Sequence, residues 1–168
     1  SNFYKRLVFD EILSTFLISS EIRKKIKKIK KNSKIFSNKG LKYILKKFKF
    51  KLTDDQIKSL NEINEDISSK EKMFRLLQGD VGSGKTIIAL ISSLNVIESG
   101  YQVAFMSPTE ILSRQHYNLA KKLFPSKVNL ELLSSKTDYL NKKQIIKNIK
   151  TNKVNIVFGT HSLFQKKI

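Results

Sequence analysis

Cysteine is absent from this 168-residue chain, so a disulfide framework and a thiolate metal site are both excluded. Long hydrophobic runs are absent as well. The longest wholly apolar stretch, residues 87–91, is far shorter than the roughly 20 residues that a helix needs to cross a bilayer. The first residues lack an apolar signal-peptide core followed by a small-residue cleavage site. We therefore expect a cytoplasmic protein with no membrane partner, and a chain long enough to bury a core.

Acidic residues are scarce: 14 Asp and Glu stand against 33 Lys and Arg, which gives a net charge of +19. Residues 21–51 hold 14 of the basic residues and one acidic residue, Glu21, and so carry +13 of that charge. Concentrated positive charge favours a polyanionic partner, of which nucleic acid is the usual one. Most of the basic residues are lysines, however, and such a skew is also typical of an AT-rich genome. Charge alone therefore leaves nucleic-acid binding open.

Residues 79–86 read G-D-V-G-S-G-K-T and match the P-loop pattern G-x-x-x-x-G-K-[ST] at every fixed position. In this pattern the glycines let backbone N–H groups turn toward phosphate oxygens, and a following helix adds the positive end of its dipole. The lysine reaches the β- and γ-phosphates, and the threonine hydroxyl helps to hold Mg²⁺. The pattern therefore predicts a site for ATP and Mg²⁺, with Lys85 and Thr86 as catalytic residues and Thr86 on the metal. The predicted nucleotide-binding residues are Gly79, Asp80, Val81, Gly82, Ser83, Gly84, Lys85 and Thr86.

The surroundings of the P-loop match what this pattern requires. Residues 73–77 form a short, mostly apolar run, which predicts a buried strand leading into the loop. Residues 86–97 predict a helix, and Gly100 stands where a helix C-terminal glycine belongs. The alternative, a glycine-rich turn that binds nothing, is disfavoured because strand, loop and helix are all indicated.

Strand and helix patterns alternate after the P-loop helix, which is typical of βαβ units and a parallel sheet. The fold class is therefore α/β, with a P-loop sheet of four strands and flanking helices. The predicted strands are residues 73–77, 101–107, 128–133 and 154–158, and the predicted helices between them are 86–97, 110–124 (with Thr109 as N-cap) and 141–150.

The part before the P-loop is predicted to be helical and to divide near residue 50. Residues 3–31 show helical periodicity, and residues 41–50 form a second basic segment. Thr53 and Gln56 form a capping box that begins another helix, whose apolar face continues to Ile67. We interpret residues 1–49 as a helical basic connector and residues 50–168 as the first part of the α/β domain. The connector's lysines could lie on a nucleic-acid backbone or simply be solvated.

Five segments of the chain match one known pattern in order and spacing: K-R-L-V-F-D-E-I-L (5–13), F-K-L-T-D-D-Q (50–56), R-L-L-Q-G-D-V-G-S-G-K-T (75–86), G-Y-Q-V-A-F-M-S-P-T-E-I-L-S-R-Q-H (100–116) and I-V-F-G-T-H-S-L-F-Q (156–165). Together they resemble the RecG family of bacterial DNA helicases, and the resemblance covers nearly the whole chain. Members of that family are ATP-driven translocases that act on double-stranded DNA at stalled replication forks and recombination junctions. The resemblance therefore implies an ATP-dependent DNA helicase of repair and recombination, with a RecA-like motor fold, branched DNA as partner and a monomeric state.

The resemblance also assigns roles outside the P-loop. Gln56 matches the family's adenine-reading glutamine, with Phe50 near the base, although capping explains Gln56 equally well. Two three-residue segments match motifs that contact DNA. These segments are Pro108, Thr109 and Glu110, and Gly159, Thr160 and His161.

Three alternatives remain open from the sequence. The transcription–repair coupling translocase has a similar motor, although Gln78, Ser83 and Glu110 favour RecG. A short protein that binds nucleotide and nucleic acid without catalysis would show the same P-loop. A basic nucleic-acid-binding protein with an unused P-loop would bind DNA regardless of Lys85 and would have no affinity for nucleotide.

A D-E-x-H or D-E-x-D box, which would supply an Mg²⁺-binding aspartate and a water-positioning glutamate, does not follow the P-loop in this chain. Phosphoryl transfer depends on positioning and charge stabilisation by all of these parts. We therefore predict that this polypeptide by itself binds ATP or ADP weakly and does not turn ATP over at a useful rate. Multiple-turnover release of phosphate that Lys85→Ala abolishes would contradict this.

Overall fold

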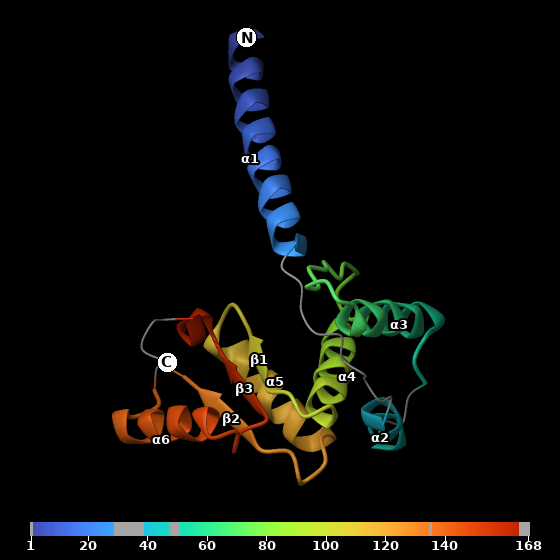
Figure 1. Ribbon diagram of the computed structural model, residues 1–168, viewed down its shortest axis with the longest axis vertical. Helices are drawn as coiled ribbons and strands as arrows, with labels where there is room; N and C mark the ends of the chain where they lie inside the picture. The colour runs from blue at the N-terminus through green and yellow to red at the C-terminus, as the bar shows by residue number, and fades with distance from the viewer. Residues whose placement is uncertain (1, 29–38, 48–50, 135, 165–168) are drawn as a thin grey trace.

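The computed structural model describes residues 2–28, 39–47, 51–134 and 136–164, so the predictions made for residues 29–38 and for Phe50 lie outside it (Figure 1). The described part is an α/β fold with a parallel sheet, as predicted. In chain order the elements are α1 (Asn2–Lys28), α2 (Lys39–Lys47), α3 (Asp54–Ser68), α4 (Lys85–Glu98), β1 (Val103–Met106), α5 (Glu110–Leu123), β2 (Leu130–Leu133), α6 (Tyr139–Lys150), β3 (Ile156–Gly159) and the 3-10 helix η1 (His161–Phe164).

The described sheet has three strands in the order β1-β3-β2, and both pairs are parallel. Ile156 of β3 lies opposite Val103 on one side and Leu130 on the other. The strands are parallel because a helix returns the chain across the sheet between them: α5 follows β1 and α6 follows β2. The last strand in the sequence therefore becomes the central one, and it is buried along its whole length.

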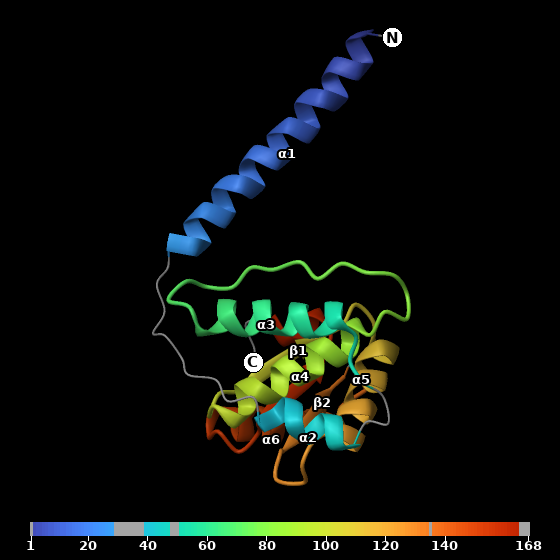
Figure 2. The same cartoon turned by 90° about the vertical axis from the view of Figure 1, so that its right-hand side faces the viewer.

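Helices cover both faces of the sheet (Figures 1 and 2). Successive side chains of β3 point to opposite faces, and their contacts show which helices lie on each face. Ile156 and Phe158 point into the main core, which they share with α4 and α5. Val157 points the other way, into a smaller cluster with Leu133 and with Ile145 of α6. The parallel sheet is therefore apolar on both sides, as is usual for such sheets.

Helix α4, which begins at the P-loop, lies at the centre of the main core. Leu90, Ile91 and Leu94 have no exposed surface. Both α2 and α3 pack against α4 on the side away from the sheet. At the α2 contact the backbones approach so closely that a side chain at Gly40 would meet Asn95 Oδ1 at 2.8 Å. The P-loop helix is therefore held from several sides.

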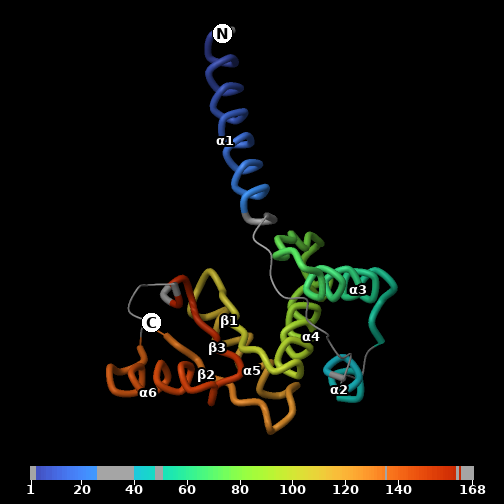
Figure 3. The backbone as a smooth tube through the Cα atoms, in the orientation of Figure 1, coloured from blue at the N-terminus to red at the C-terminus, as the bar shows by residue number. Residues whose placement is uncertain are grey.

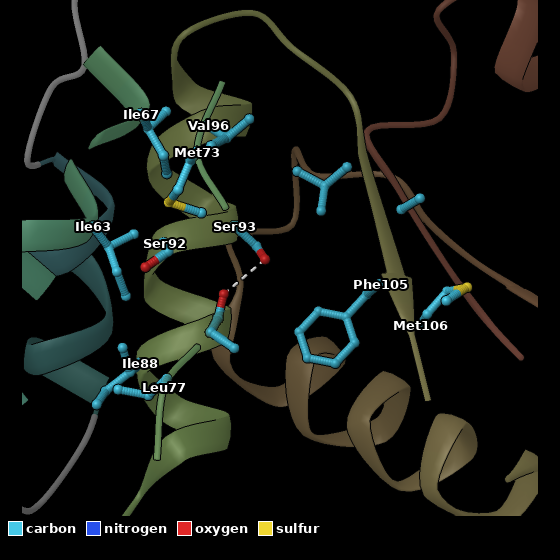
Figure 4. Close-up of a pocket in the computed structure, with 13 residues that line it drawn as sticks. Ile63, Ile67, Met73, Leu77, Ile88, Ser92, Ser93, Val96, Phe105 and Met106 are labelled. Carbon is cyan, nitrogen blue, oxygen red and sulfur yellow. Dashed lines mark hydrogen bonds between the residues drawn. The ribbon is translucent and has the colours of Figure 1, made fainter. Parts of the chain in front are cut away.

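The strand predicted for residues 73–77 is wrong, because residues 72–80 form neither helix nor strand. The segment instead runs back alongside α3 to the P-loop (Figures 2 and 3). A strand forms only when a neighbour pairs with it, and within the described residues β1 pairs with β3 alone. A groove lies beside the outer edge of β1, with Ile67 and Met73 on one side and Phe105 on the other (Figure 4). The groove's lining is almost entirely apolar, which matches a sheet that has room for further strands.

Helix α1 projects away from the other helices (Figure 1). Its apolar residues are largely exposed, including Phe3, Phe9 and Phe16, each more than 60% accessible. A cation–π contact joins its C-terminal half to the rest of the chain: the Arg23 guanidinium lies 5.7 Å from the Phe74 ring centroid. Within the described residues no helix combines the length and apolar character that a bilayer crossing requires.

Candidate nucleotide-binding site

Two glycines of the P-loop have backbone angles that side-chain-bearing residues rarely adopt. Gly82 has φ 85° and Gly84 has φ 84°, both in the left-handed region. Gly84 is also the N-cap of α4, so the helix begins at Lys85 and its first N–H groups face the loop. The loop is closed from within by a hydrogen bond from Ser83 N–H to Asp80 O, 3.2 Å long.

The Lys85 ammonium is turned back onto the loop, where it makes two hydrogen bonds. Its Nζ donates to Gly79 O at 2.6 Å and to Asp80 O at 2.7 Å. The side chain therefore spans the loop that it follows and places a positive charge at the centre of the turn. A phosphate oxygen entering this turn would compete with two neutral carbonyls for the same ammonium, and a charged acceptor makes the stronger hydrogen bond.

Gln56 performs two tasks at once. Its Oε1 accepts from Thr53 N–H at 3.1 Å, and Thr53 Oγ1 accepts from Gln56 N–H at 3.3 Å, so the predicted capping box is present. Its Nε2 donates to Ser83 O at 2.9 Å. A side chain at Gly84 would meet this same Nε2 at 2.5 Å and would have to displace the Gln56 amide, while the φ of 84° itself favours glycine there. The beginning of α3 is thus bound directly to the P-loop.

A pocket of about 430 Å³ brings most of the predicted nucleotide-binding residues together. Three described residues of that set do not line it: Val81 lies at the exposed tip of the loop, Gly84 is the N-cap of α4, and Thr86 is half-buried in the first turn of α4. The sequence analysis did not single out Asp55 and Ser59, which line the pocket from α3 beside Gln56. The predicted residues that line the pocket are Gln56, Gly79, Asp80, Gly82, Ser83 and Lys85.

Arg75 is another residue that the sequence analysis passed over. It lies on the segment of residues 72–78 that leads into the P-loop, here called the entry arm. Its Nε donates to Asp66 Oδ2 at 2.6 Å and its Nη1 to Glu62 Oε2 at 2.5 Å. The hydrogen bond to Asp66 raises the pKa of Arg75, with Glu62 adding to the effect. The available signal was one charged residue inside an otherwise apolar run of five.

The residues predicted to contact DNA lie at a different place, at the carboxyl ends of β1 and β3. Because these strands are parallel neighbours, the two segments emerge at the same edge of the sheet. Ser107 N–H donates to Gly159 O at 2.9 Å and ties them together. A side chain at Gly159 would meet Leu133 O at 2.9 Å, so only glycine fits there. The exposed members are Pro108, Thr109 and His161, while Glu110 and Thr160 are half-buried and Gly159 is buried.

Thr109 and the other histidine have clear structural roles at this edge. Thr109 Oγ1 accepts from Leu112 N–H at 3.3 Å and caps α5, as predicted. His116 of α5 packs its ring against Phe105, with the centroids 5.3 Å apart. Burial lowers the pKa of His116 below its ordinary value, which favours the neutral form of the ring.

Comparison of the chain with known proteins identifies helicases as its relatives. The model of the DEAD/DEAH box helicase family matches residues 53–168. The chain is 42% identical over 167 residues to an ATP-dependent DNA helicase RecG of Aquifex aeolicus, and 42% identical over 162 residues to one of Borreliella burgdorferi. These alignments cover 99% and 95% of this chain but only 21% and 23% of the relatives. The chain therefore spans less than a quarter of the length of either.

A solved structure of RecG bound to a three-way DNA junction has the same fold over most of this chain. The TM-score is 0.84 at 37% sequence identity, with 96% of this chain and 22% of that one covered.

The two tasks of Gln56 can be separated by one substitution. Gln56→Glu keeps an oxygen for the capping box but replaces the Nε2 donor with an oxygen that repels Ser83 O. We expect amides of residues 79–84 to exchange with deuterated solvent several-fold faster, while those of α3 do not change. Thr53→Ser, which keeps the cap, is the control. Unchanged exchange across the P-loop would mean that the Ser83 contact does not hold the loop.

Proposed function

Because the chain belongs to the DEAD/DEAH box helicase family, we propose that it is the ATP-binding part of an ATP-dependent DNA helicase that acts on branched DNA. The observation that carries the proposal is the P-loop, whose glycine geometry, lysine and following helix stand together at one pocket. In this proposal residues 1–49 are the connector to the preceding part and residues 50–168 begin the first motor domain. The whole protein would act as a monomer in the bacterial cytoplasm, where its DNA is found.

The residues present fit a nucleotide with Mg²⁺. Gly82 and Gly84 adopt the φ values that turn a loop around an anion, and the dipole of α4 adds partial positive charge at Gly84. The Lys85 ammonium already lies among acceptors at the centre of the turn. No negatively charged side chain pairs with Lys85 among the described residues, so its charge is available to phosphate oxygens.

Each of these residues has a defined part in the proposed site. Bound ATP with Mg²⁺ supplies the phosphoryl group whose transfer to water releases the free energy for movement along DNA. Lys85 holds the β- and γ-phosphate oxygens by charge, and the hydroxyl of Thr86, the next residue in the chain, would ligate the metal. Gln56 lies beside the loop and is proposed to read the adenine edge, with Phe50 near the base. Its contact to Ser83 would then connect recognition of the base to the shape of the loop.

The DNA-contacting part of the proposal rests on the edge of the sheet beyond β1 and β3. Thr109 and His161 are exposed there, and Pro108 stands between β1 and the N-terminus of α5. Helix N-termini and hydroxyls are common contacts to DNA phosphates. We propose that these residues contact the backbone of one DNA strand. The junction DNA in the RecG structure supports branched DNA as the substrate class.

Lys85→Ala should weaken nucleotide binding strongly. The variant loses a charge-assisted contact to phosphate worth about 1.5–3 kcal/mol, which is roughly a tenfold to hundredfold loss of affinity. Calorimetric titration of the chain with Mg²⁺ and ADP measures the change. Lys58→Ala removes an exposed lysine from α3 and is the matched control for charge. Equal affinity of both variants would rule out the P-loop as the site.

Thr109→Asp tests the DNA edge without removing the cap, because Asp and Thr both cap helices well. A new negative charge about 4 Å from a phosphate costs about 1 kcal/mol in water, so affinity for a short three-way junction should fall about fivefold. Fluorescence anisotropy at a fixed ionic strength measures this, since binding itself weakens steeply with salt. Thr53→Asp places the same charge at the cap of α3 and should bind DNA normally, as should Lys85→Ala. An equal effect of the two Asp variants would contradict a contact at Thr109.

A further inference from the structure

The entry arm lacks the usual anchors of a segment that leads into a P-loop. Among the described residues it pairs with no strand, and its apolar side chains Met73, Phe74 and Leu76 are 40%, 61% and 85% exposed. Leu77 alone packs against the main core from this segment. Neither sheet hydrogen bonds nor apolar burial therefore accounts for the position of the arm between residues 72 and 76.

Arg75 holds the entry arm in place through ion pairs rather than through apolar burial. Its guanidinium makes two hydrogen-bonded ion pairs with carboxylates four residues apart on α3, Glu62 and Asp66, which share one face of that helix. Two separate nitrogens are used, so the fork of the guanidinium fixes both the position and the direction of the arm. A lysine could supply the charge here but not this geometry.

Helix α3 is a firm base for these contacts. Leu60 and Ile63 bury its inner side against the core that holds α4. At its N-terminal end α3 also contacts the P-loop near the beginning of α4, because Gln56 of α3 donates to the Ser83 carbonyl. The same helix thus contacts the chain four residues before Gly79 and again two residues before Lys85.

We propose that Arg75 is a positioning residue of the nucleotide site, which acts by clamping the entry arm of the P-loop to Glu62 and Asp66 of α3. Helix α3 then sets the position of the loop from both sides: Arg75 holds the chain as it enters and Gln56 holds it as it leaves. The inference rests on the nucleotide-binding role proposed for the P-loop and adds a residue that touches neither the phosphates nor the metal.

Arg75→Gln should weaken binding of Mg²⁺ and a fluorescent ADP analogue about threefold to tenfold, the range that two partly exposed ion pairs support. Lys72→Gln removes an equal charge from the same arm and should bind as the parent chain does. Amides of residues 79–84 should also exchange faster in Arg75→Gln without nucleotide, while those of β3 do not change. Unchanged affinity and exchange, or equally faster exchange in β3, would overturn the proposal.

A double-mutant cycle identifies the partner of Arg75. If Arg75 acts through α3, the variant carrying Glu62→Gln and Asp66→Asn should lose a similar factor, and adding Arg75→Gln to it should cost little more. Losses that multiply would mean that Arg75 acts on the site in another way, and would overturn the proposal. If the parent chain bound no nucleotide, the proposed function would fail, and the same cycle measured by exchange at residues 79–84 would still decide the role of Arg75.

Discussion

Burial of α4 is the constraint on which the rest of the structure depends. This helix begins at Lys85, the lysine of the P-loop pattern, and Leu90, Ile91 and Leu94 on it are fully buried. The sheet covers one side of α4, while α2 and α3 cover the other. Because α4 is firmly packed, it fixes the position of the C-terminal end of the P-loop. The glycines of the loop then need only turn the chain, and they do so at φ values that other residues would resist.

Helix α3 completes the support of the loop. It packs on α4 through apolar residues and reaches the P-loop through polar ones: Gln56 at one end, and Glu62 and Asp66 further along. Apolar burial is non-directional and fixes where the helix lies, whereas hydrogen bonds and ion pairs fix the angle and register of the chain beside it. The candidate site therefore depends on residues that would not be chosen from the P-loop pattern itself.

The residues predicted to contact DNA lie on a second surface that is separate from the residues lining the nucleotide pocket. Residues beyond β1 and β3 meet because the two strands are adjacent, although more than 40 residues separate them in the chain. The resemblance to RecG helicases noted from five short segments is confirmed by relatives 42% identical and by a structure of TM-score 0.84. The particular roles of Thr109, His161 and Gln56 stay predictions.

Local patterns in the sequence by themselves determined the P-loop, the capping box at Thr53, the cap at Thr109 and the alternation of strands and helices. Each depends on residues a few positions apart, so the chain's own geometry is sufficient. The strand expected at residues 73–77 failed because a strand depends on a partner that local pattern does not show. Only the tertiary structure decided that β3 is the central strand, that Gln56 reaches Ser83 and that Arg75 reaches α3. These contacts join segments brought together by packing around α4, and no spacing in the sequence encodes them.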